Sequence, residues 1–541
     1  MTSTSPSNLP AETGRWHPRL IEAAMAMNDN RLDVAERLIK PHLKEDPFDV
    51  FAIRMLAELA GRIGRWRDSE HLLRRAIELA PGWTAAKSNL AMVLDRMGRP
   101  SEALELLDEV FAAEPDNVGH WNLKAATLAR LGDFDEALEV YEHVLERAPG
   151  QPRVWTGYGH ILKTVGRLDD GIAAYRKAIA IEPGLGEAWW SLANLKTVKF
   201  SADDIAAMQA ALVLGKLGDE SRFHLDFALG KAFHDQGRSA EAFAHFATAN
   251  AQRRMLHPHD AKDIRAMVDA VIRVFTPAAL SALAGGCPSR APIFVVGMPR
   301  AGSTLIEQIL SSHSQIEGTT ELPDMPVLAR SRGAYPKGAL KLTEDERNDI
   351  GEDYLKRSAV QRRTQRPLFI DKLPNNWLFV PFIHLVLPNA KIIDARRHPL
   401  ACCFSNFRQH FARGQNFAYD LGDVGAYFAD YVRLMAHVDA VLPGRVHRVI
   451  YEQMVEDTEA EVRALLDHLG LAFEPACLEF YNNERAVRTP SSEQVRRPIY
   501  RDSGDEWLPY EAHLGPLKEA LGAVLDAYPD APRDILATVP K

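Results

Sequence analysis

Proline recurs at a constant interval of 34 residues through the first third of the chain. The positions are Pro47, Pro81, Pro115, Pro149 and Pro183. A second series has the same interval and consists of Asn30, Gly64, Gly98, Gly132 and Gly166. Five residues after each member of that series stands a small residue, namely Ala35, Ser69, Ala103, Ala137 and Gly171. Two landmarks with one period predict a single supersecondary unit that is used several times.

Each landmark has a physical role in a helical hairpin. Glycine or asparagine accommodates the left-handed backbone that ends the first helix. The small residue lets the second helix approach the first, and the proline stops the second helix. A 34-residue unit of this kind resembles the tetratricopeptide repeat. The resemblance covers residues 17–254, including a less regular stretch over 187–220 and a further unit in which Gly237 and Ala242 keep the five-residue offset.

The resemblance implies an all-α superhelix, because one hairpin alone cannot bury its apolar face and must stack on its neighbours. The concave groove of such a superhelix usually binds a peptide or another protein. A protein partner is therefore expected, although the sequence does not identify it. Residues 255–290 are still partly helical and end in GGCPSRAP, so we expect a helical linker there.

The hydrophobic pattern changes directly after the linker. The run PIFVVG is typical of a buried parallel strand, and it is followed by the loop MPRAGST and the amphipathic segment LIEQILSSH. A glycine loop between a strand and a helix binds phosphate through its backbone N–H groups. The spacing Gly297-x4-Gly302-Ser303-Thr304 matches a nucleotide triphosphate loop, except that Ser303 occupies the lysine position. That lysine reaches the β- and γ-phosphates, so its loss favours a donor without a γ-phosphate, held by the backbone and by Arg300.

The loop and the motifs that follow it resemble sulfotransferases, specifically the protein-tyrosine sulfotransferase branch, over residues 291–510. The motifs are PRAGST, GTTEL, LFIDKLP, KIIDARRHPLACCFS, VIYEQMV and SSEQVRRPI. The resemblance implies an α/β domain of the P-loop type with a parallel sheet, expected over residues 291–525. It also implies 3′-phosphoadenylyl sulfate (PAPS) as the donor substrate and 3′,5′-adenosine bisphosphate (PAP) as the product.

Four residues are implied as catalytic by this resemblance. Glu321 follows Thr304 by seventeen residues, as the family's glutamate base does, and would accept the proton of an acceptor hydroxyl. Lys372, at the end of the next core strand, would stabilise the leaving phosphate. Arg300 would hold phosphate or sulfuryl oxygens, and Ser491 would add a further hydrogen-bond donor.

The resemblance also implies a set of donor-binding residues. Arg397 and Ser405, eight residues apart, would hold the 3′-phosphate, and Tyr451 would lie against the adenine. The full set is Arg300, Ala301, Gly302, Ser303, Thr304, Arg397, Ser405, Tyr451, Ser491, Ser492, Gln494, Val495, Arg496 and Arg497. No metal is expected, since no cluster of histidine and carboxylate residues has the spacing of metal ligands.

The chain departs from the family pattern at two positions. The family's second arginine for the 3′-phosphate falls on Gln409, with Arg408 beside it, and a family lysine falls on Glu506. We expect the compensating positive charge to come from Arg408, Arg496, Arg497 or Arg501, without choosing among them.

Several alternatives remain open at the level of the sequence. Small-molecule sulfotransferases use a histidine base, but the comparable block here is Asp371-Lys372-Leu373-Pro374, so the base role moves to Glu321. Glu321 could instead cap a helix. The domain could also be a nucleotide kinase-like P-loop enzyme, or an inactive part of a repeat scaffold. The acceptor stays undetermined among peptide tyrosine, sugar, lipid and small phenol.

The composition excludes several other classes of protein. The formal net charge of the 541 residues is −9, so no global positive field attracts nucleic acid or an acidic membrane. The four cysteines form no CxxC pair, which predicts a reducing compartment. The first residues lack the pattern of a signal peptide, and no run of about 18 apolar residues is present. We therefore expect a cytoplasmic protein without a nucleic-acid or membrane partner.

Overall fold

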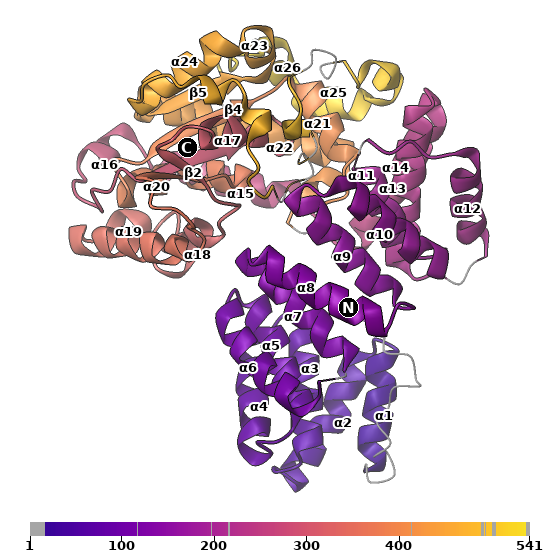
Figure 1. Ribbon diagram of the computed structural model, residues 1–541. Coiled ribbons are helices and arrows are strands. Elements are labelled where there is room, and N and C mark those ends of the chain that lie inside the picture. The colour runs from indigo at the N-terminus through magenta and orange to yellow at the C-terminus, as the bar shows by residue number, and fades with distance from the viewer. Residues whose placement is uncertain are drawn as a thin grey trace. The chain divides into compact units, whose positions relative to one another are not determined.

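The computed structural model describes residues 17–115, 117–195, 197–214, 217–412, 414–487, 489, 492, 494–499 and 505–536 (Figure 1). The chain divides into two compact units, Met1–Ile161 and Leu162–Lys541. The first unit consists of helical repeats. The second contains further helices of the same kind together with a five-stranded sheet.

The helices of the first unit have similar lengths and follow one another at short intervals. They are α1 (Pro18–Asn28), α2 (Leu32–Glu45), α3 (Val50–Arg62), α4 (Trp66–Leu79), α5 (Thr84–Arg96), α6 (Pro100–Ala113), α7 (Val118–Leu131), α8 (Phe134–Arg147) and most of α9 (Pro152–Val165). Consecutive helices pack in pairs, α1 with α2, α3 with α4, α5 with α6 and α7 with α8. The prediction of a helical-hairpin superhelix is confirmed.

The turns and interfaces of these pairs explain the periodic residues. The backbone is left-handed at every turn residue, with φ of +57° at Asn30, +79° at Gly64, +77° at Gly98 and +93° at Gly132. Each small residue five positions later is buried, with exposed fractions of 0% for Ala35, 1% for Ser69, 0% for Ala103 and 0% for Ala137. The sequence period therefore reflects a repeated backbone turn and a repeated close contact between helices.

The second unit begins with more helices of this type. They are α10 (Leu168–Ile181), α11 (Gly186–Asn194), α12 (Ala202–Val213), α13 (Asp219–Asp235), α14 (Ser239–Leu256), α15 (Ala261–Val274) and α16 (Pro277–Ser281). Helices α13 and α14 pack together around the turn at Gly237, where φ is +72°, and Ala242 is fully buried. This is the additional hairpin that the five-residue offset predicts. Helices α15 and α16 lie within residues 255–290.

The sheet is wholly parallel and has the strand order β2-β3-β1-β4-β5. Its strands are β1 (Pro292–Gly297), β2 (Ile316–Gly318), β3 (Leu368–Asp371), β4 (Lys391–Arg396) and β5 (Val446–Ile450). Every residue of the central strand β1 is buried, as its continuous apolar run predicts. The predicted parallel α/β fold is therefore confirmed.

The connections of the sheet are mostly helical. The α-helices are α17 (Ser303–Ser311), α18 (Asp324–Ser331), α19 (Glu344–Ala359), α20 (Val380–Val386), α21 (Pro399–Phe407), α22 (Leu421–Val441), α23 (Tyr451–Glu456), α24 (Thr458–Leu469), α25 (Gly515–Leu521) and α26 (Ala523–Ala527). The 3₁₀ turns are η3 (Ala339–Lys341), η4 (Pro374–Phe379), η5 (Asn416–Tyr419), η6 (Pro475–Cys477), η7 (Phe480–Asn482), η8 (Gln494–Arg496) and η10 (Leu508–His513). Within the described part of the chain, none of the helices combines the length and the apolar character needed to cross a bilayer.

The last repeat hairpin is joined to the sheet-bearing part of the second unit by specific polar contacts. The side-chain amide of Asn250 on α14 is buried and donates to the carbonyl of Phe407 at 2.8 Å. His234 on α13 contacts the hydroxyl of Tyr510 in η10 at 2.7 Å through Nδ1. Breaking these contacts would leave buried polar groups without partners, which costs free energy. The contacts therefore help to hold α13 and α14 in the same folded body as the sheet.

Candidate active site

The carboxyl end of each strand is followed by one residue of the predicted site. Glu321 follows β2, Lys372 follows β3, Arg300 follows β1, Arg397 follows β4 and Tyr451 begins the helix after β5. Because all five strands are parallel, these ends lie along one edge of the sheet, where ligands bind in open α/β sheets. The fold therefore collects residues that are separated by up to 151 positions in the sequence.

The loop after β1 has a backbone conformation suited to an anion. Arg300 has φ of +67° and Gly302 has φ of +96°. Gly302 directly precedes α17, so Ser303 and Thr304 form the first turn of that helix, whose backbone N–H groups have no partners within the helix. A Cβ atom on Gly302 would lie 2.7 Å from Cδ2 of Tyr451. Glycine is therefore required for both the backbone angle and the close approach of the tyrosine ring.

A cavity opens beside this loop and contains most of the predicted donor-binding residues. The predicted residues that line it are Arg300, Gly302, Ser303, Thr304, Arg397, Ser405, Tyr451, Gln494, Val495 and Arg497. The other lining residues are Leu305, Phe480, Pro498, Ile499 and Glu506. Within the described residues, no group of three or more His, Cys, Asp or Glu side chains is placed to hold a metal ion.

Direct contacts join the residues predicted for the two ends of the donor. Arg300 Nε donates to Ser405 Oγ at 3.1 Å, and its Nη2 donates to Gln494 Oε1 at 3.4 Å. Arg397 Nη1 donates to the carbonyl of Arg300 at 3.4 Å. The guanidinium of Arg397 also lies over the ring of Tyr451, with its Cζ 4.7 Å from the ring centroid. The loop and the β4 side therefore face a single cavity.

The electrostatics of this cavity favour an anion. Burial, together with the positive charges of Arg397 and Arg408, lowers the pKa of Arg300 to about 10. Guanidinium groups that are removed from water and close to one another gain from a bound phosphate, because an anion offsets both the desolvation and the repulsion.

Two positions that depart from the family pattern have distinct surroundings. Arg408 forms an ion pair with Glu506, which lines the cavity. Burial alone would raise the pKa of Glu506, but the Arg408 charge and hydrogen bond outweigh burial and lower it to about 2. Gln409 instead donates to the side chain of Asn194 on α11 at 3.1 Å. Of the two neighbours, Arg408 is therefore connected to the cavity wall and Gln409 to the repeat helices.

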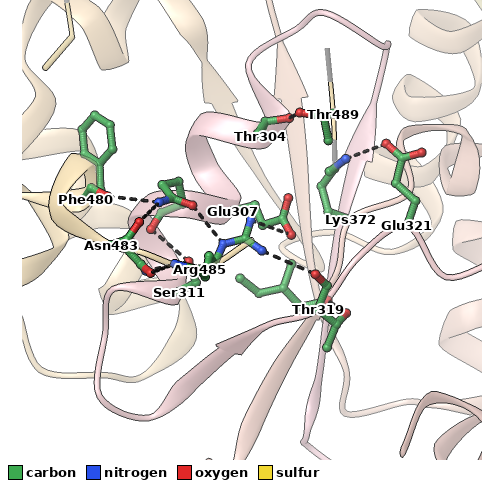
Figure 2. Close-up of polar contacts among 12 residues, drawn as sticks. Thr304, Glu307, Ser311, Thr319, Glu321, Lys372, Phe480, Asn483, Arg485 and Thr489 are labelled. Atoms are coloured by element: carbon green, nitrogen blue, oxygen red, sulfur yellow. Dashed lines mark hydrogen bonds and ion pairs between the residues drawn. The ribbon is translucent and has the colours of Figure 1, made fainter. Parts of the chain in front are cut away.

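Lys372 and Glu321 form an ion pair at the β2–β3 side of the site (Figure 2). The distance between Lys372 Nζ and Glu321 Oε1 is 2.6 Å. The lysine side chain is 2% exposed, whereas that of the glutamate is 49% exposed. A buried cation and a carboxylate that reaches solvent therefore stand together at the strand ends.

Asp371, the residue before Lys372, is a buried carboxyl group. It accepts a hydrogen bond from the hydroxyl of Tyr354 at 2.9 Å and is hydrogen-bonded to the backbone of Leu322, the residue after Glu321. Burial raises the pKa of Asp371 to about 8, against the lowering effect of these hydrogen bonds and of the Lys372 charge. Asp371 thus connects the end of β3 to the loop that carries Glu321.

A few predicted residues have other surroundings. Ala301 is buried within the loop after β1, and Ser492 is fully buried. Arg496 donates to the carbonyl of Thr164 at 3.4 Å, near the end of α9. Ser491 lies outside the described residues.

The structure adds polar residues that the motifs do not indicate. Thr489 Oγ1 lies 3.2 Å from Thr304 Oγ1 on the first turn of α17. Arg485 pairs with Glu307 of the same helix at 2.9 Å. Two sequence features could have indicated these residues. Arg485 and Thr489 come just before the SSEQVRRPI motif, and Glu307 is a glutamate within an otherwise apolar helix.

Comparisons with known proteins agree with this architecture. The model of the sulfotransferase family matches residues 292–475, and tetratricopeptide-repeat models match residues 88–152 and 128–196. The chain therefore carries tetratricopeptide repeats followed by a domain that matches the sulfotransferase family.

Individual relatives are distant. An uncharacterized protein of Aquifex aeolicus (strain VF5) is 33% identical over 342 residues, which cover 60% of this chain but only 45% of that protein. A putative protein-tyrosine sulfotransferase of Caenorhabditis briggsae is 23% identical over 195 residues, or 35% of this chain and 69% of that protein. The solved sulfotransferase domain from the Synechococcus PCC 7002 olefin synthase is 23% identical, covers 41% of this chain and 88% of that domain, and has a TM-score of 0.32.

Proposed function

We propose that this protein transfers a sulfuryl group from PAPS to a hydroxyl acceptor. The observation that carries the proposal is the Lys372–Glu321 ion pair at the same sheet edge as the cavity that holds Arg300 and Arg397. Glu321 is the general base, and Lys372 stabilises the leaving phosphate. Ser491 is retained in the proposed catalytic set on the family motif alone.

The residues of the cavity fit the donor's chemical groups. Arg300 and the N-terminus of α17 suit the 5′-phosphosulfate, and Arg397 with Ser405 suits the 3′-phosphate. The Tyr451 ring and the apolar residues of the cavity wall suit the adenine. Ser303 in place of the triphosphate-loop lysine fits a donor that has no γ-phosphate.

The reaction is a direct displacement at sulfur. Glu321 takes the proton of the acceptor hydroxyl as the oxygen–sulfur bond forms. The bond between sulfur and the bridging oxygen breaks, and its electron pair leaves with the phosphate of PAP, where the Lys372 ammonium offsets the new charge. The carboxylate and the ammonium lie side by side, 2.6 Å apart, so both can reach one reacting centre, and the proton on Glu321 then passes to solvent.

The repeats have a proposed role in recognition. We assign residues 17–254 to a repeat domain that binds the acceptor or a partner protein, residues 255–290 to a helical linker and residues 291–525 to the transferase. We place the protein in the cytoplasm, on the composition and cysteine content of the chain.

Calorimetry with PAP and with ATP, each with and without Mg²⁺, tests the donor. We expect PAP to bind without Mg²⁺ and more tightly than ATP. Equal or tighter binding of ATP that depends on Mg²⁺ would support a kinase-like enzyme instead. Failure to bind either nucleotide would support the alternative that the protein is a catalytically inactive repeat scaffold.

Turnover tests the base and narrows the acceptor. The release of PAP from PAPS is measured with a tyrosine peptide, a sugar, a lipid alcohol and a small phenol. With the acceptor that gives turnover, Glu321→Ala should reduce kcat by about a hundredfold or more while the PAP affinity stays within about threefold. Parallel loss of affinity and turnover would show that Glu321 is structural.

A further inference from the structure

Arg485 contacts three residues in two separate parts of the chain, the helix α17 and the segment just before Glu321 (Figure 2). Its Nε donates to Gln308 Oε1 at 2.9 Å, its Nη1 donates to the carbonyl of Thr319 at 3.4 Å, and its Nη2 pairs with Glu307 Oε1 at 2.9 Å. The Arg485 side chain is 15% exposed and that of Glu307 is 2% exposed. The motifs assign no role to any of these four residues.

Two of these contacts are on the phosphate-binding helix. Glu307 and Gln308 belong to α17, whose N-terminal residues line the cavity. The Gln308 amide also donates to the carbonyls of Phe480 and Asn483 at 3.2 and 3.1 Å. The segment around Arg485 is thereby attached to α17 at several points.

The third contact is on the loop that carries the base. Thr319 is two residues before Glu321, and its hydroxyl donates to the carbonyl of Ile370 at 2.5 Å. Ile370 is in turn two residues before Lys372. Thr319 therefore fixes the end of β2 to the end of β3, and Arg485 fixes the same residue to α17.

The packing leaves little freedom around this junction. A Cβ atom on Gly318 would lie 3.0 Å from Cζ of Arg485, so the end of β2 rests directly on the guanidinium. The three contacts of Arg485 use three different nitrogens of one planar group. Lysine has a single nitrogen and cannot reproduce this arrangement.

We infer that Arg485 is a positioning residue, which sets the Glu321 carboxylate relative to the phosphate-binding end of α17. This inference rests on the proposed sulfuryl transfer. Arg485 contacts neither reacting group; it acts through Thr319 and α17. A base displaced by about 1 Å loses roughly a hundredfold in rate without any loss of donor binding.

The test compares Arg485→Lys with Arg366→Lys. Arg366 is a matched control because its Nη1 also holds carbonyls at the end of α17 and the start of β2, those of Ser311 and Ile316, at 3.0 and 2.6 Å. These carbonyls lie at the opposite end of β2 from Glu321. We expect Arg485→Lys to lower kcat between about tenfold and a hundredfold, with the PAP affinity within about threefold of the wild type, and Arg366→Lys to leave both nearly unchanged.

Other outcomes overturn the inference. An unchanged kcat in Arg485→Lys, an equal loss in Arg366→Lys, or a parallel loss of PAP affinity would each mean that Arg485 only supports the fold. Should Arg485→Lys fail to fold, Thr319→Val removes the hydroxyl anchor of the same loop and should lower kcat alone; a normal kcat there refutes the inference. If the wild-type protein binds no PAP, the proposed function itself fails, and the inference fails with it.

Discussion

The guanidinium groups of Arg300 and Arg397 face one cavity and contact polar and aromatic side chains around it. Arg300 donates to Ser405 and Gln494, and Arg397 lies over the ring of Tyr451. Burial and the nearby positive charges of Arg397 and Arg408 lower the pKa of Arg300. At the scale of single residues, the cavity is therefore prepared for an anion before any ligand arrives.

A substitution at Gly302 tests whether the shape of the loop after β1 is needed for anion binding. Gly302→Ala should lower the free energy of unfolding by about 1–2 kcal/mol because of its positive φ, and should weaken PAP binding about tenfold or more, since the new Cβ displaces the Tyr451 ring. Gly470→Ala is the control: Gly470 has φ of +75° at the end of α24, and a Cβ there meets no atom within 4 Å. Calorimetry should show normal PAP affinity for the control. A Gly302→Ala protein with normal affinity would contradict this account of the loop.

Asp371 predicts a pH dependence of stability. Its pKa is raised from 3.8 to about 8, first by burial and also by the charge of Asp324. Between pH 4 and pH 8 the folded protein keeps a proton that the unfolded chain has released. Stability from this group therefore falls as the pH rises, by up to about 1.4 kcal/mol per pH unit.

Urea unfolding of the wild type and of Asp371→Asn at pH 5, 6 and 7 measures this effect. The variant cannot ionise, so its stability relative to the wild type should increase with pH. Parallel pH profiles would show that the neighbouring Lys372 charge keeps the carboxylate ionised in the folded protein.

At the scale of elements, the close contact between paired helices determines how the repeats tolerate substitution. Ala103 on α6 is fully buried in a cluster with Leu90 and Leu94 of α5. Ala103→Leu overfills this interface and should destabilise the first unit by about 1–3 kcal/mol. Ala112→Leu, at an exposed position of the same helix, should change stability by less than about 0.5 kcal/mol. Denaturant unfolding measures both, and equal effects would contradict the predicted packing.

The sequence predicts elements better than it predicts contacts between distant elements. The turn residues, the strands and the order of site residues along the chain follow from local patterns, because a left-handed turn or a buried strand restricts residue type at fixed spacing. The ion pair of Arg485 with Glu307 joins residues 178 positions apart, and no local pattern encodes it. A glutamate in an amphipathic helix is expected on the exposed face, yet Glu307 is buried. The sequence likewise cannot distinguish the adjacent residues Arg496 and Arg497. In the structure Arg497 lines the cavity, whereas Arg496 donates to the carbonyl of Thr164.

At the scale of the whole molecule, the boundary between compact units falls within the repeat array, between Ile161 and Leu162. The helices from α10 onward share a unit with the sheet, and Asn250 and His234 attach α14 and α13 to it. The later repeat helices therefore belong to the repeat array and also to the folded body that contains the cavity.

Two truncations test this division. A fragment that begins at residue 150 retains α9 to α14, and it should bind PAP with the affinity of the full chain. A fragment that begins at residue 258 loses α13 and α14 and leaves their polar contacts without partners, so its Tm should fall by several degrees or more. Calorimetry and thermal unfolding measure the two effects. Equal Tm values for the two fragments would show that the sheet-bearing part folds independently of the repeats.

The strand order has a kinetic consequence. The cavity lies beside the ends of β1, β4 and β5, whereas Glu321 and Lys372 follow β2 and β3. In the proposed reaction, the nucleotide and the acceptor hydroxyl would therefore approach the reacting centre from opposite halves of the sheet. The proposed direct displacement would then need both substrates on the protein together, without a covalent sulfo-protein intermediate. Double-reciprocal plots at several acceptor concentrations should intersect instead of running parallel, and a single molecule that links adenosine bisphosphate to an acceptor analogue should bind more tightly than either half.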